Sequence, residues 1–477
     1  MIYAIGSIIY LGLVLYALYH LILTGQRPAK TLAWIIAIIT VPVVGLILYY
    51  IVGINRRMLK FNKKIARRRV ASYHKKVTAL QKAQFGADTS DWSNTESQLE
   101  RLIRINSSFP ATDGNLVDPL YNGELTFDAI FEALGNAEHF IHVQYYIFEE
   151  GELTEKLFTI FRRKIKKGVK IRLIYDGLGS FGLSRAYLDR LDEIGVEHIC
   201  YLPIISKRID STLNFRNHRK ISVVDGKVGF TGGINVTDKY IHGDTRNGRW
   251  YDIHVRVEGP AVASLNAVFL MDWYYGSEDG ELLSDIYFPP MKKIGDTIAQ
   301  VVHSGPDTSF SSVQQQYFQL INRANKYVYI ANSYVIPGEA ILLALKTAAI
   351  SGKDVRLLLP KNSDSKLVEW TIRSYLPELI KANIKVFLFD KGFLHCKLVL
   401  VDDEIASIGT ANLDIRSFEQ NFEVNLLMYD EEITKELKGH FLSYCSLSTQ
   451  YTVEDHRNRS HRAKILEGLA RIFSPIL

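Results

Sequence analysis

Two long apolar stretches open the chain. Residues 2–23 contain no Lys, Arg, Asp or Glu and a single histidine, His20, and residues 32–53 contain no charged side chain. Each stretch is about 22 residues long, which allows a helix to cross roughly 30 Å of hydrocarbon. We therefore expect a two-helix transmembrane hairpin over residues 1–54, with its turn between Gly25 and Lys30 and with Pro42 tolerated in the second helix.

Two other interpretations would fit one such stretch taken alone. A buried helix of a soluble protein is the first, but two apolar stretches in succession make it improbable. A cleaved signal peptide is the second, and it fits poorly because the chain has no basic leader, no convincing small-residue cleavage site and a second apolar stretch directly afterwards. The pattern favours a membrane anchor.

A basic segment follows the apolar stretches. Ten lysines and arginines and no acid lie between Arg56 and Lys76, and without them the net charge of +6 would be −4. Positive residues beside a span favour the cytoplasmic side and attract anionic lipid head groups. Arg27 and Lys30, in the turn, argue weakly for the opposite orientation. Nucleic acid is another partner for a basic cluster, but its place beside a predicted span favours lipid, and we expect no nucleic-acid partner.

The rest of the chain contains an internal repeat. Residues 141–148 match 328–335, and the stretch beginning at Gly168 matches the one beginning at Gly352. Each half alternates strand and helix, which indicates an α/β fold. We expect four parts: the hairpin 1–54, a basic juxtamembrane segment and linker 55–110 that includes the polar stretch from Gly86 to Thr95, a first domain 111–290 and a second domain 291–477.

The C-terminal segment from Arg462 to Leu477 has helical periodicity. Its apolar residues fall on one face, namely Ile465, Leu466, Leu469, Ile472, Phe473 and Ile476. Such an amphipathic helix either packs against the body of the protein or lies in a membrane interface, and the sequence leaves both possibilities open.

One short motif, H-x-K-x-x-x-x-D, occurs twice at a separation of 177 residues. A single copy would be weak evidence, but both copies also have an asparagine 17 residues after the histidine. The two sets are His218, Lys220, Asp225 and Asn235, and His395, Lys397, Asp402 and Asn412. Apolar, β-branched residues follow each lysine and predict a buried strand, so each histidine and lysine should begin a core strand with both side chains on one face.

These residue types suit chemistry on a phosphodiester. Lys220, Lys397, Asn235 and Asn412 would bind the phosphate and stabilise the negative charge that develops in the transition state. One histidine would attack phosphorus while the other protonates the leaving oxygen, giving a phosphohistidine intermediate. This scheme needs no metal and no cofactor.

The acidic residues require separate treatment. An offset of seven places Asp225 and Asp402 on the strand face opposite their histidines, and Asp225-Gly226 is a hairpin-turn signal. Although they belong to the catalytic motif, we interpret both aspartates as positioning the strand and its turn. Better candidates for orienting the histidines are Asp252 and Glu423, because a carboxylate on one ring nitrogen selects the tautomer.

The doubled motif resembles the phospholipase D superfamily, and neighbouring residues narrow the resemblance to bacterial cardiolipin synthase. The residues that carry it are 214–220, 231–235, Trp273, 304–307, 409–414 and 416–418. The resemblance implies two phospholipase D-like α/β sandwich repeats related by pseudo-twofold symmetry, preceded here by the transmembrane hairpin. It also implies that two phosphatidylglycerol molecules become cardiolipin and glycerol, with His218 as nucleophile and His395 as general acid. The chain departs from the family at 332–337 and at Cys396, which bears on acyl or head-group fit.

The remaining expectations concern compartment and partners. Three widely spaced cysteines, Cys200, Cys396 and Cys445, offer no disulfide framework and indicate a reducing compartment. We expect a membrane-embedded, multi-pass enzyme of the bacterial inner membrane, with its body in the cytoplasm and with phosphatidylglycerol and other anionic phospholipids as partners. Alternatives are a hydrolase of phospholipase D type, another head-group transferase, a nuclease and an inactive lipid-binding scaffold. The sequence leaves the oligomeric state open.

Overall fold

The computed structural model describes residues 2–23, 28–41, 43–50, 94–203, 214–277, 285–308 and 310–474. The chain divides into two compact units, one made of residues 1–66 with 204–215 and the other of residues 67–203 with 216–477. We call the second the main unit.

The smaller unit contains three described helices, α1 (Ile2–Leu23), α2 (Pro28–Thr40) and α3 (Val44–Leu48). Its buried apolar side chains form one small cluster, which consists of Ala17, Leu21, Ile38, Leu46 and Tyr49.

The predicted two-helix transmembrane hairpin is wrong. In the part of the chain that the structure describes, no helix combines the length and the apolar character needed to cross a membrane. The second apolar stretch is interrupted, because α2 ends at Thr40 and α3 begins only at Val44. Pro42 lies between them in the sequence, and a proline inside a helix removes a hydrogen bond and clashes with the preceding turn. The 13 residues of α2 extend about 20 Å, which is less than the hydrocarbon thickness of about 30 Å.

The basic cluster from Arg56 to Lys76 lies outside the described residues, as does the polar stretch from Gly86 to Ser93. Their roles stay predictions. Asn94 and Thr95, the last two residues of the polar stretch, begin helix α6 (Asn94–Ser107).

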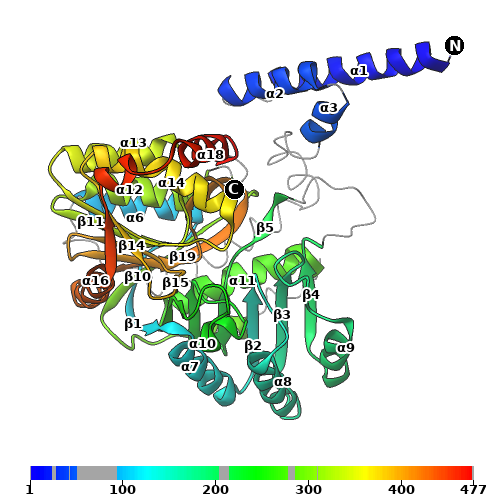
Figure 1. The fold of residues 1–477 in the computed structure, drawn as a ribbon. Helices are drawn as coiled ribbons and strands as arrows, with labels where there is room; N and C mark the ends of the chain where they lie inside the picture. The colour runs from blue at the N-terminus through cyan, green and yellow to red at the C-terminus, as the bar shows by residue number, and fades with distance from the viewer. Residues whose placement is uncertain are drawn as a thin grey trace. The chain divides into compact units, whose positions relative to one another are not determined.

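The main unit consists of two halves with similar element order (Figure 1). In the first half the strands are β1 (Thr112–Tyr121), β2 (Phe140–Tyr145), β3 (Lys170–Asp176), β4 (Glu197–Tyr201), β5 (Arg216–Asn217), β6 (Ile221–Val224), β7 (Val228–Gly232), β8 (Trp250–Tyr251) and β9 (Ile253–Glu258). Its helices are α7 (Asn122–Asn136), α8 (Glu152–Ile165), α9 (Arg185–Ile194), α10 (Lys239–His242), α11 (Ala261–Ser277) and the short 3₁₀ helix η4 (Asp285–Tyr287).

The second half repeats this order with additional helices at its end. Its strands are β10 (Thr297–Ser304), β11 (Tyr327–Asn332), β12 (Val335–Ile336), β13 (Asp354–Pro360), β14 (Lys385–Phe389), β15 (Phe393–Leu394), β16 (Lys397–Val401), β17 (Ile405–Gly409), β18 (Leu413–Asp414), β19 (Asn421–Tyr429) and β20 (Ser448–Tyr451). Its helices are α12 (Ser312–Arg323), α13 (Glu339–Ile350), α14 (Lys366–Lys381), α15 (Ile415–Glu419), α16 (Glu431–Ser446), α17 (Val453–Arg457) and α18 (His461–Arg471).

Among the described residues, the two halves share one sheet of 16 strands whose order is nearly symmetric about its centre. β1 and β10 lie in the middle as antiparallel neighbours. Outward from them the order is β9-β7-β6-β2-β3-β4 on one side and β19-β17-β16-β11-β13-β14 on the other, where β20 adds an edge strand. This order is that of an α/β fold with two repeats, as the sequence predicts.

The repeated segments form the innermost parallel strands of each half. β2 pairs with β3 in parallel, and β11 pairs with β13 in the same way. Every residue of β2 and β11 is buried. β11 is mostly apolar, as expected for a strand covered on both faces. β2 alternates apolar residues with His142 and Gln144, which are buried and hydrogen-bonded to Asn266 and Asp272 of α11.

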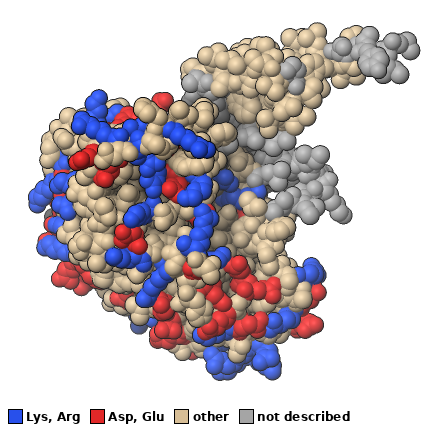
Figure 2. Space-filling view, in the orientation of Figure 1, with Lys and Arg blue, Asp and Glu red and all other residues tan. Residues whose placement is uncertain are grey.

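Both signs of charge cover the visible face of the main unit (Figure 2). Lys and Arg side chains are prominent over the end that carries α13, α14 and α18, and Asp and Glu side chains gather toward the end that carries α7, α8 and α10 (Figures 1 and 2).

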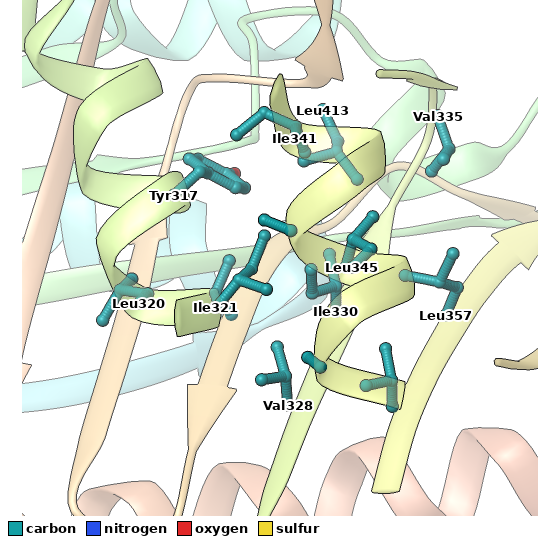
Figure 3. Packing of buried hydrophobic residues seen from close by; sticks show 14 of the residues in the cluster. Tyr317, Leu320, Ile321, Val328, Ile330, Val335, Ile341, Leu345, Leu357 and Leu413 are labelled. Carbon is teal, nitrogen blue, oxygen red and sulfur yellow. The ribbon is translucent and has the colours of Figure 1, made fainter. Parts of the chain in front are cut away.

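Each half has its own apolar core. In the first half α7, α8 and α9 pack on the sheet through a cluster that includes Phe127, Leu157 and Leu191. In the second half α12 and α13 lie over β11 and β13, and Tyr317, Ile321, Ile341 and Leu345 meet Val328, Ile330 and Leu357 from the strands (Figure 3). The active-site strands therefore rest on two rigid layers.

Candidate active site

Each motif histidine follows a short strand that pairs with the opposite half. β5, just before His218, pairs in parallel with β19 of the second half, and the amide of His218 donates to the carbonyl of Phe422 at 2.9 Å. β15, just before His395, pairs in parallel with β8 of the first half, and the amide of His395 donates to the carbonyl of Tyr251 at 2.7 Å. The backbone of each half thus holds the histidine of the other.

Each motif histidine also contacts a carboxylate from the opposite half. Nδ1 of His218 lies 3.0 Å from both carboxylate oxygens of Glu423. Nδ1 of His395 lies 2.7 Å from Oδ2 of Asp252. A carboxylate at Nδ1 keeps the proton on that nitrogen and leaves Nε2 available for chemistry. The sequence predicts Asp252 and Glu423 as partners of the histidines, and the structure adds that each acid serves the histidine of the other half.

The two carboxylates are held differently. The hydroxyl of Thr410 donates to Glu423 at 2.5 Å, and the amide group of Asn421 donates to the same carboxylate at 3.2 Å. Gly233 occupies the position in the first motif that Thr410 occupies in the second, and a Cβ there would lie 2.1 Å from Oδ1 of Asp252. Glycine is therefore required for Asp252 to approach.

A tyrosine hydroxyl lies beside the pair formed by His395 and Asp252. The buried side chain of Tyr240 places its hydroxyl 3.0 Å from Nδ1 of His395 and 3.4 Å from the carbonyl of Gly233. Because Nδ1 carries its proton toward Asp252, the hydroxyl accepts from the imidazole and can donate to Gly233. The structure thereby adds a group near His395 that the motif spacing does not indicate.

The two lysines fold back onto their own histidines. Nζ of Lys220 donates to the carbonyl of His218 at 2.7 Å. Nζ of Lys397 donates to the carbonyl of His395 and, at 3.3 Å, to the hydroxyl of Ser333. Both ammonium groups are buried, and burial lowers the pKa of each, that of Lys220 to about 7. Nζ of Lys397 also lies 2.9 Å from Nδ1 and 3.0 Å from Nε2 of His395.

Burial also dominates the acid–base properties of the histidines and Glu423. Desolvation lowers the pKa of His218 well below its ordinary value, and the neighbouring Lys220 lowers it further. Desolvation and then Lys397 lower the pKa of His395 to about 4. Desolvation raises the pKa of Glu423 to about 7. Both imidazoles are thus neutral near pH 7, and an anion bound beside them would raise their pKa values.

The two histidines open into one cleft of about 400 Å³. Asn235 and Asn412 line it with them, so four of the predicted residues meet there from both halves. Neither motif lysine is among the described lining residues. The wall also includes Tyr146, Trp250, Tyr334, Arg216, Arg416 and Asp414. The two arginines add positive charge. They lie within stretches that carry the family resemblance, but the sequence analysis assigns them no role.

Comparison with known proteins places this geometry in a family. The family model described as cardiolipin synthase, phospholipase D-like domain, matches residues 130–273 and 317–445. A cardiolipin synthase of Geobacillus sp. strain WCH70 is 38% identical over 469 residues, which cover 97% of this chain and 92% of the relative. The chain belongs to the cardiolipin synthase family. The resemblance drawn from the motifs is thereby confirmed.

Three further matches concern a second relative, the N-terminal segment and the fold. A cardiolipin synthase of Geobacillus kaustophilus strain HTA426 is 38% identical over 475 residues, 99% of this chain and 92% of the relative. A model described as phospholipase D-nuclease N-terminal matches residues 12–53. Among solved structures, phosphatidylserine synthase from Haemophilus influenzae Rd KW20 has a TM-score of 0.61 at 15% identity, covering 80% of this chain and all of that one. The last match concerns the fold alone.

The motif aspartates of this cardiolipin synthase family member lie away from the cleft. Asp225 accepts three backbone amides, from Glu138, His139 and Phe140, at 2.7–2.8 Å. Asp402 accepts the equivalent three, from residues 325–327, at 2.5–2.8 Å. Both have positive φ, 53° and 55°, and begin the tight turns after β6 and β16. The structure gives them the positions of strand-anchoring residues that touch neither histidine.

Cys396 lies beside His395 but its side chain points elsewhere. It is buried with Sγ 3.6 Å from the carbonyl of Tyr251. Burial raises the pKa of this thiol well above its ordinary value, so it stays protonated. Cys396 therefore serves as a packing residue.

Proposed function

We propose that this member of the cardiolipin synthase family transfers a phosphatidyl group from one phosphatidylglycerol molecule to another, forming cardiolipin and releasing glycerol. The observation that carries the proposal is the pair of crossed histidine–carboxylate contacts at one cleft. They orient two imidazoles through Nδ1, so that the two Nε2 atoms can carry out a two-step transfer at phosphorus. Family membership supplies the substrate class.

In the first step Nε2 of His218 attacks the phosphorus of the donor lipid. The new N–P bond forms as the bond from phosphorus to the glycerol oxygen breaks. His395, protonated, gives its Nε2 proton to that oxygen, so glycerol leaves neutral. The enzyme then carries a phosphatidyl group on His218 and a neutral His395.

In the second step His395 acts as a base. It takes the proton from a hydroxyl of the second phosphatidylglycerol, whose oxygen attacks phosphorus while the N–P bond to His218 breaks. Cardiolipin leaves, and both histidines return to their starting protonation states. Asn235 and Asn412 would donate to the phosphate oxygens from either half, while Lys220 and Lys397, buried beside their histidines, stabilise the added negative charge.

The protonation of His395 follows from substrate binding. Its pKa of about 4 results from burial and from the neighbouring Lys397. A phosphodiester anion beside the imidazole favours the charged form and raises this pKa, with Asp252 compensating the new imidazolium charge. His395 therefore takes up a proton from solvent as the substrate binds, and the first step consumes that proton.

Water competes with the second lipid for the phosphatidyl group, so the acceptor must bind before the intermediate is hydrolysed. Arg216 and Arg416 line the same cleft as the histidines. We assign to them the attraction of the acceptor phosphate, because guanidinium groups bind phosphate in a fixed geometry.

The proposed location is the cytoplasmic surface of a bacterial cell membrane. Both substrates and the product are membrane lipids. The three cysteines, Cys200, Cys396 and Cys445, are free thiols, which suits a reducing compartment.

The test uses purified full-length protein with labelled phosphatidylglycerol as sole substrate, in the presence of EDTA. We expect cardiolipin and glycerol in a ratio of one to one, and none from a His218→Ala variant. Phosphatidic acid in place of cardiolipin would instead support a hydrolase of phospholipase D type. Product from wild type only when a divalent metal replaces EDTA would contradict the metal-free scheme.

A further inference from the structure

Helix α18 has two faces of different character. Glu467 and Ala470 face inward and are buried. Ile465, Leu469, Ile472 and Phe473 are 62%, 54%, 71% and 46% exposed. They follow the spacing i, i+4, i+7, i+8 along α18 and the turn that directly follows it, where Ile472 is the C-cap, so they form one continuous apolar stripe on the solvent side.

The helix is fixed with this stripe outward. On its inner side the hydroxyl of Thr371 in α14 donates to the carbonyl of Ala470 at 3.1 Å. Arg471 donates to Glu378 of α14 at 3.0 Å, and the hydroxyls of Tyr375 and Ser474 lie 3.1 Å apart. These contacts use the polar side of an amphipathic helix against the protein and leave its apolar side in water, which is the reverse of ordinary core packing.

The segment that carries the stripe is rich in basic residues. Residues 457–474 contain five Lys and Arg side chains, namely Arg457, Arg459, Arg462, Lys464 and Arg471. The single acid of this segment, Glu467, is buried and contacts Arg459. Lys and Arg side chains are also prominent over this end of the main unit (Figure 2). An apolar stripe with a basic rim is the pattern of a helix that lies in the interface of an anionic membrane.

The position of the stripe relates it to the cleft. Ser365, the N-cap of α14, and Val368 in its first turn line the cleft. Thr371, three residues further along the same helix, already contacts α18. One rigid helix therefore connects the cleft wall to the base of α18.

We propose that the exposed face of α18 (Ile465, Leu469, Ile472 and Phe473) is a docking surface for the head-group and acyl boundary of an anionic phospholipid bilayer. Docking there holds α14 at the bilayer surface that supplies the substrate. The cleft wall formed by Ser365 and Val368 is held there with it. The benefit to catalysis rests on the proposed function, whereas the docking itself does not.

The first test is kinetic. In a Leu469→Glu, Ile472→Glu variant, the rate on phosphatidylglycerol in sealed vesicles should fall at least tenfold, while the rate in detergent mixed micelles stays within twofold of wild type. The matched control is Leu125→Glu, Leu447→Glu, which changes side chains of 57% and 50% exposure on α7 and at the end of α16. It should leave both rates unchanged. Equal vesicle rates in the two variants would overturn the proposal.

The second test does not need turnover. A full-length Cys200→Ser variant receives an environment-sensitive fluorophore on a cysteine introduced either at Ile472 or at Leu125. We expect a blue shift at position 472, and not at 125, with vesicles containing phosphatidylglycerol, and little shift with phosphatidylcholine alone. Absence of that difference would overturn docking. A concentration-dependent shift without lipid, with a doubled mass that Leu469→Glu, Ile472→Glu abolishes, would show that a second copy of the chain covers the stripe. If wild type made no cardiolipin but the label shifted, the proposed function would fail while the docking surface stood.

Discussion

Replacement of Glu423 by glutamine should make the protein less active and, at alkaline pH, more stable. The Glu423 side chain is fully buried, and its carboxylate lies 3.0 Å from Nδ1 of His218. Glutamine keeps the shape and an acceptor oxygen but removes the charge. The substitution therefore separates the electrostatic contribution of the carboxylate from its packing.

The magnitude of the activity loss follows from the hydrogen bond to His218. A hydrogen bond that involves a charged group contributes about 1.5–3 kcal/mol. If the bond strengthens as His218 becomes bonded to phosphorus and positively charged, its loss slows the first step by about 10- to 150-fold. The KM for phosphatidylglycerol should change little, because Glu423 is not among the described residues that line the cleft.

The stability effect has the opposite sign and depends on pH. Burial raises the pKa of Glu423 from 4.5 in the unfolded chain to about 7. A folded pKa above the unfolded one gives a contribution to stability that is complete below about pH 4.5 and is lost as the pH rises through 7. Glutamine does not titrate. Between pH 5 and pH 8 the free energy of unfolding of the variant should therefore rise relative to wild type by about 2–3 kcal/mol.

The assay is urea unfolding of full-length protein in detergent at a series of pH values, together with initial rates in mixed micelles. Glu339→Gln, which removes the same charge from an exposed position on α13, is the control and should change neither quantity with pH. A stability difference that stays constant from pH 5 to pH 8, or an activity within twofold of wild type, would refute the reasoning.

Three further predictions concern other parts of the site. Tyr240→Phe removes the hydroxyl 3.0 Å from Nδ1 of His395 and should lower kcat about fivefold, the effect of one neutral hydrogen bond; steady-state kinetics with an unchanged kcat would contradict this. Asp402→Asn weakens three backbone amide contacts and should lower the free energy of unfolding by about 2 kcal/mol. The folded fraction should keep its specific activity. A loss of activity without a loss of stability in urea titration would reverse the interpretation. Arg416→Ala should shift products from cardiolipin toward phosphatidic acid, with consumption of phosphatidylglycerol nearly constant, and an unaltered product ratio by chromatography would remove Arg416 from acceptor binding.

Local patterns in the sequence predict much of this molecule. Apolar runs after Lys220 and Lys397 correctly indicate buried strands, and an odd offset separates Asp225 and Asp402 from the cleft. The repeat of residues 141–148 at 328–335 predicts β2 and β11. Such features depend on side-chain periodicity over a few residues, which a sequence displays directly.

The sequence does not predict that each half supplies a backbone strand and a carboxylate to the histidine of the other half. This arrangement depends on the parallel pairing of β5 with β19 and of β15 with β8, and each of these pairs has a register of only two residues. Motif spacing indicates a histidine and an acid in each half but does not say that each acid contacts the histidine of the other half. The contact of Lys220 with the carbonyl of His218 is likewise a tertiary detail that the spacing does not indicate.

The N-terminal error has a simple cause. Hydropathy measures whether a stretch is apolar and does not measure whether it forms one continuous helix. The stretch from 32 to 53 is apolar throughout, but α2 ends at Thr40, two residues before Pro42. The restriction that proline places on the backbone overrides an apolar pattern here.

The most direct test of the account is the identity of the residue that carries the phosphatidyl group. Full-length enzyme is mixed with labelled phosphatidylglycerol, quenched within milliseconds in alkali, digested and sequenced by mass spectrometry. The account predicts the label on the peptide containing His218, with none in His218→Ala and none on His395. Label on His395 would reverse the roles of the two histidines, and cardiolipin formation with no labelled histidine at any time point would contradict the covalent mechanism.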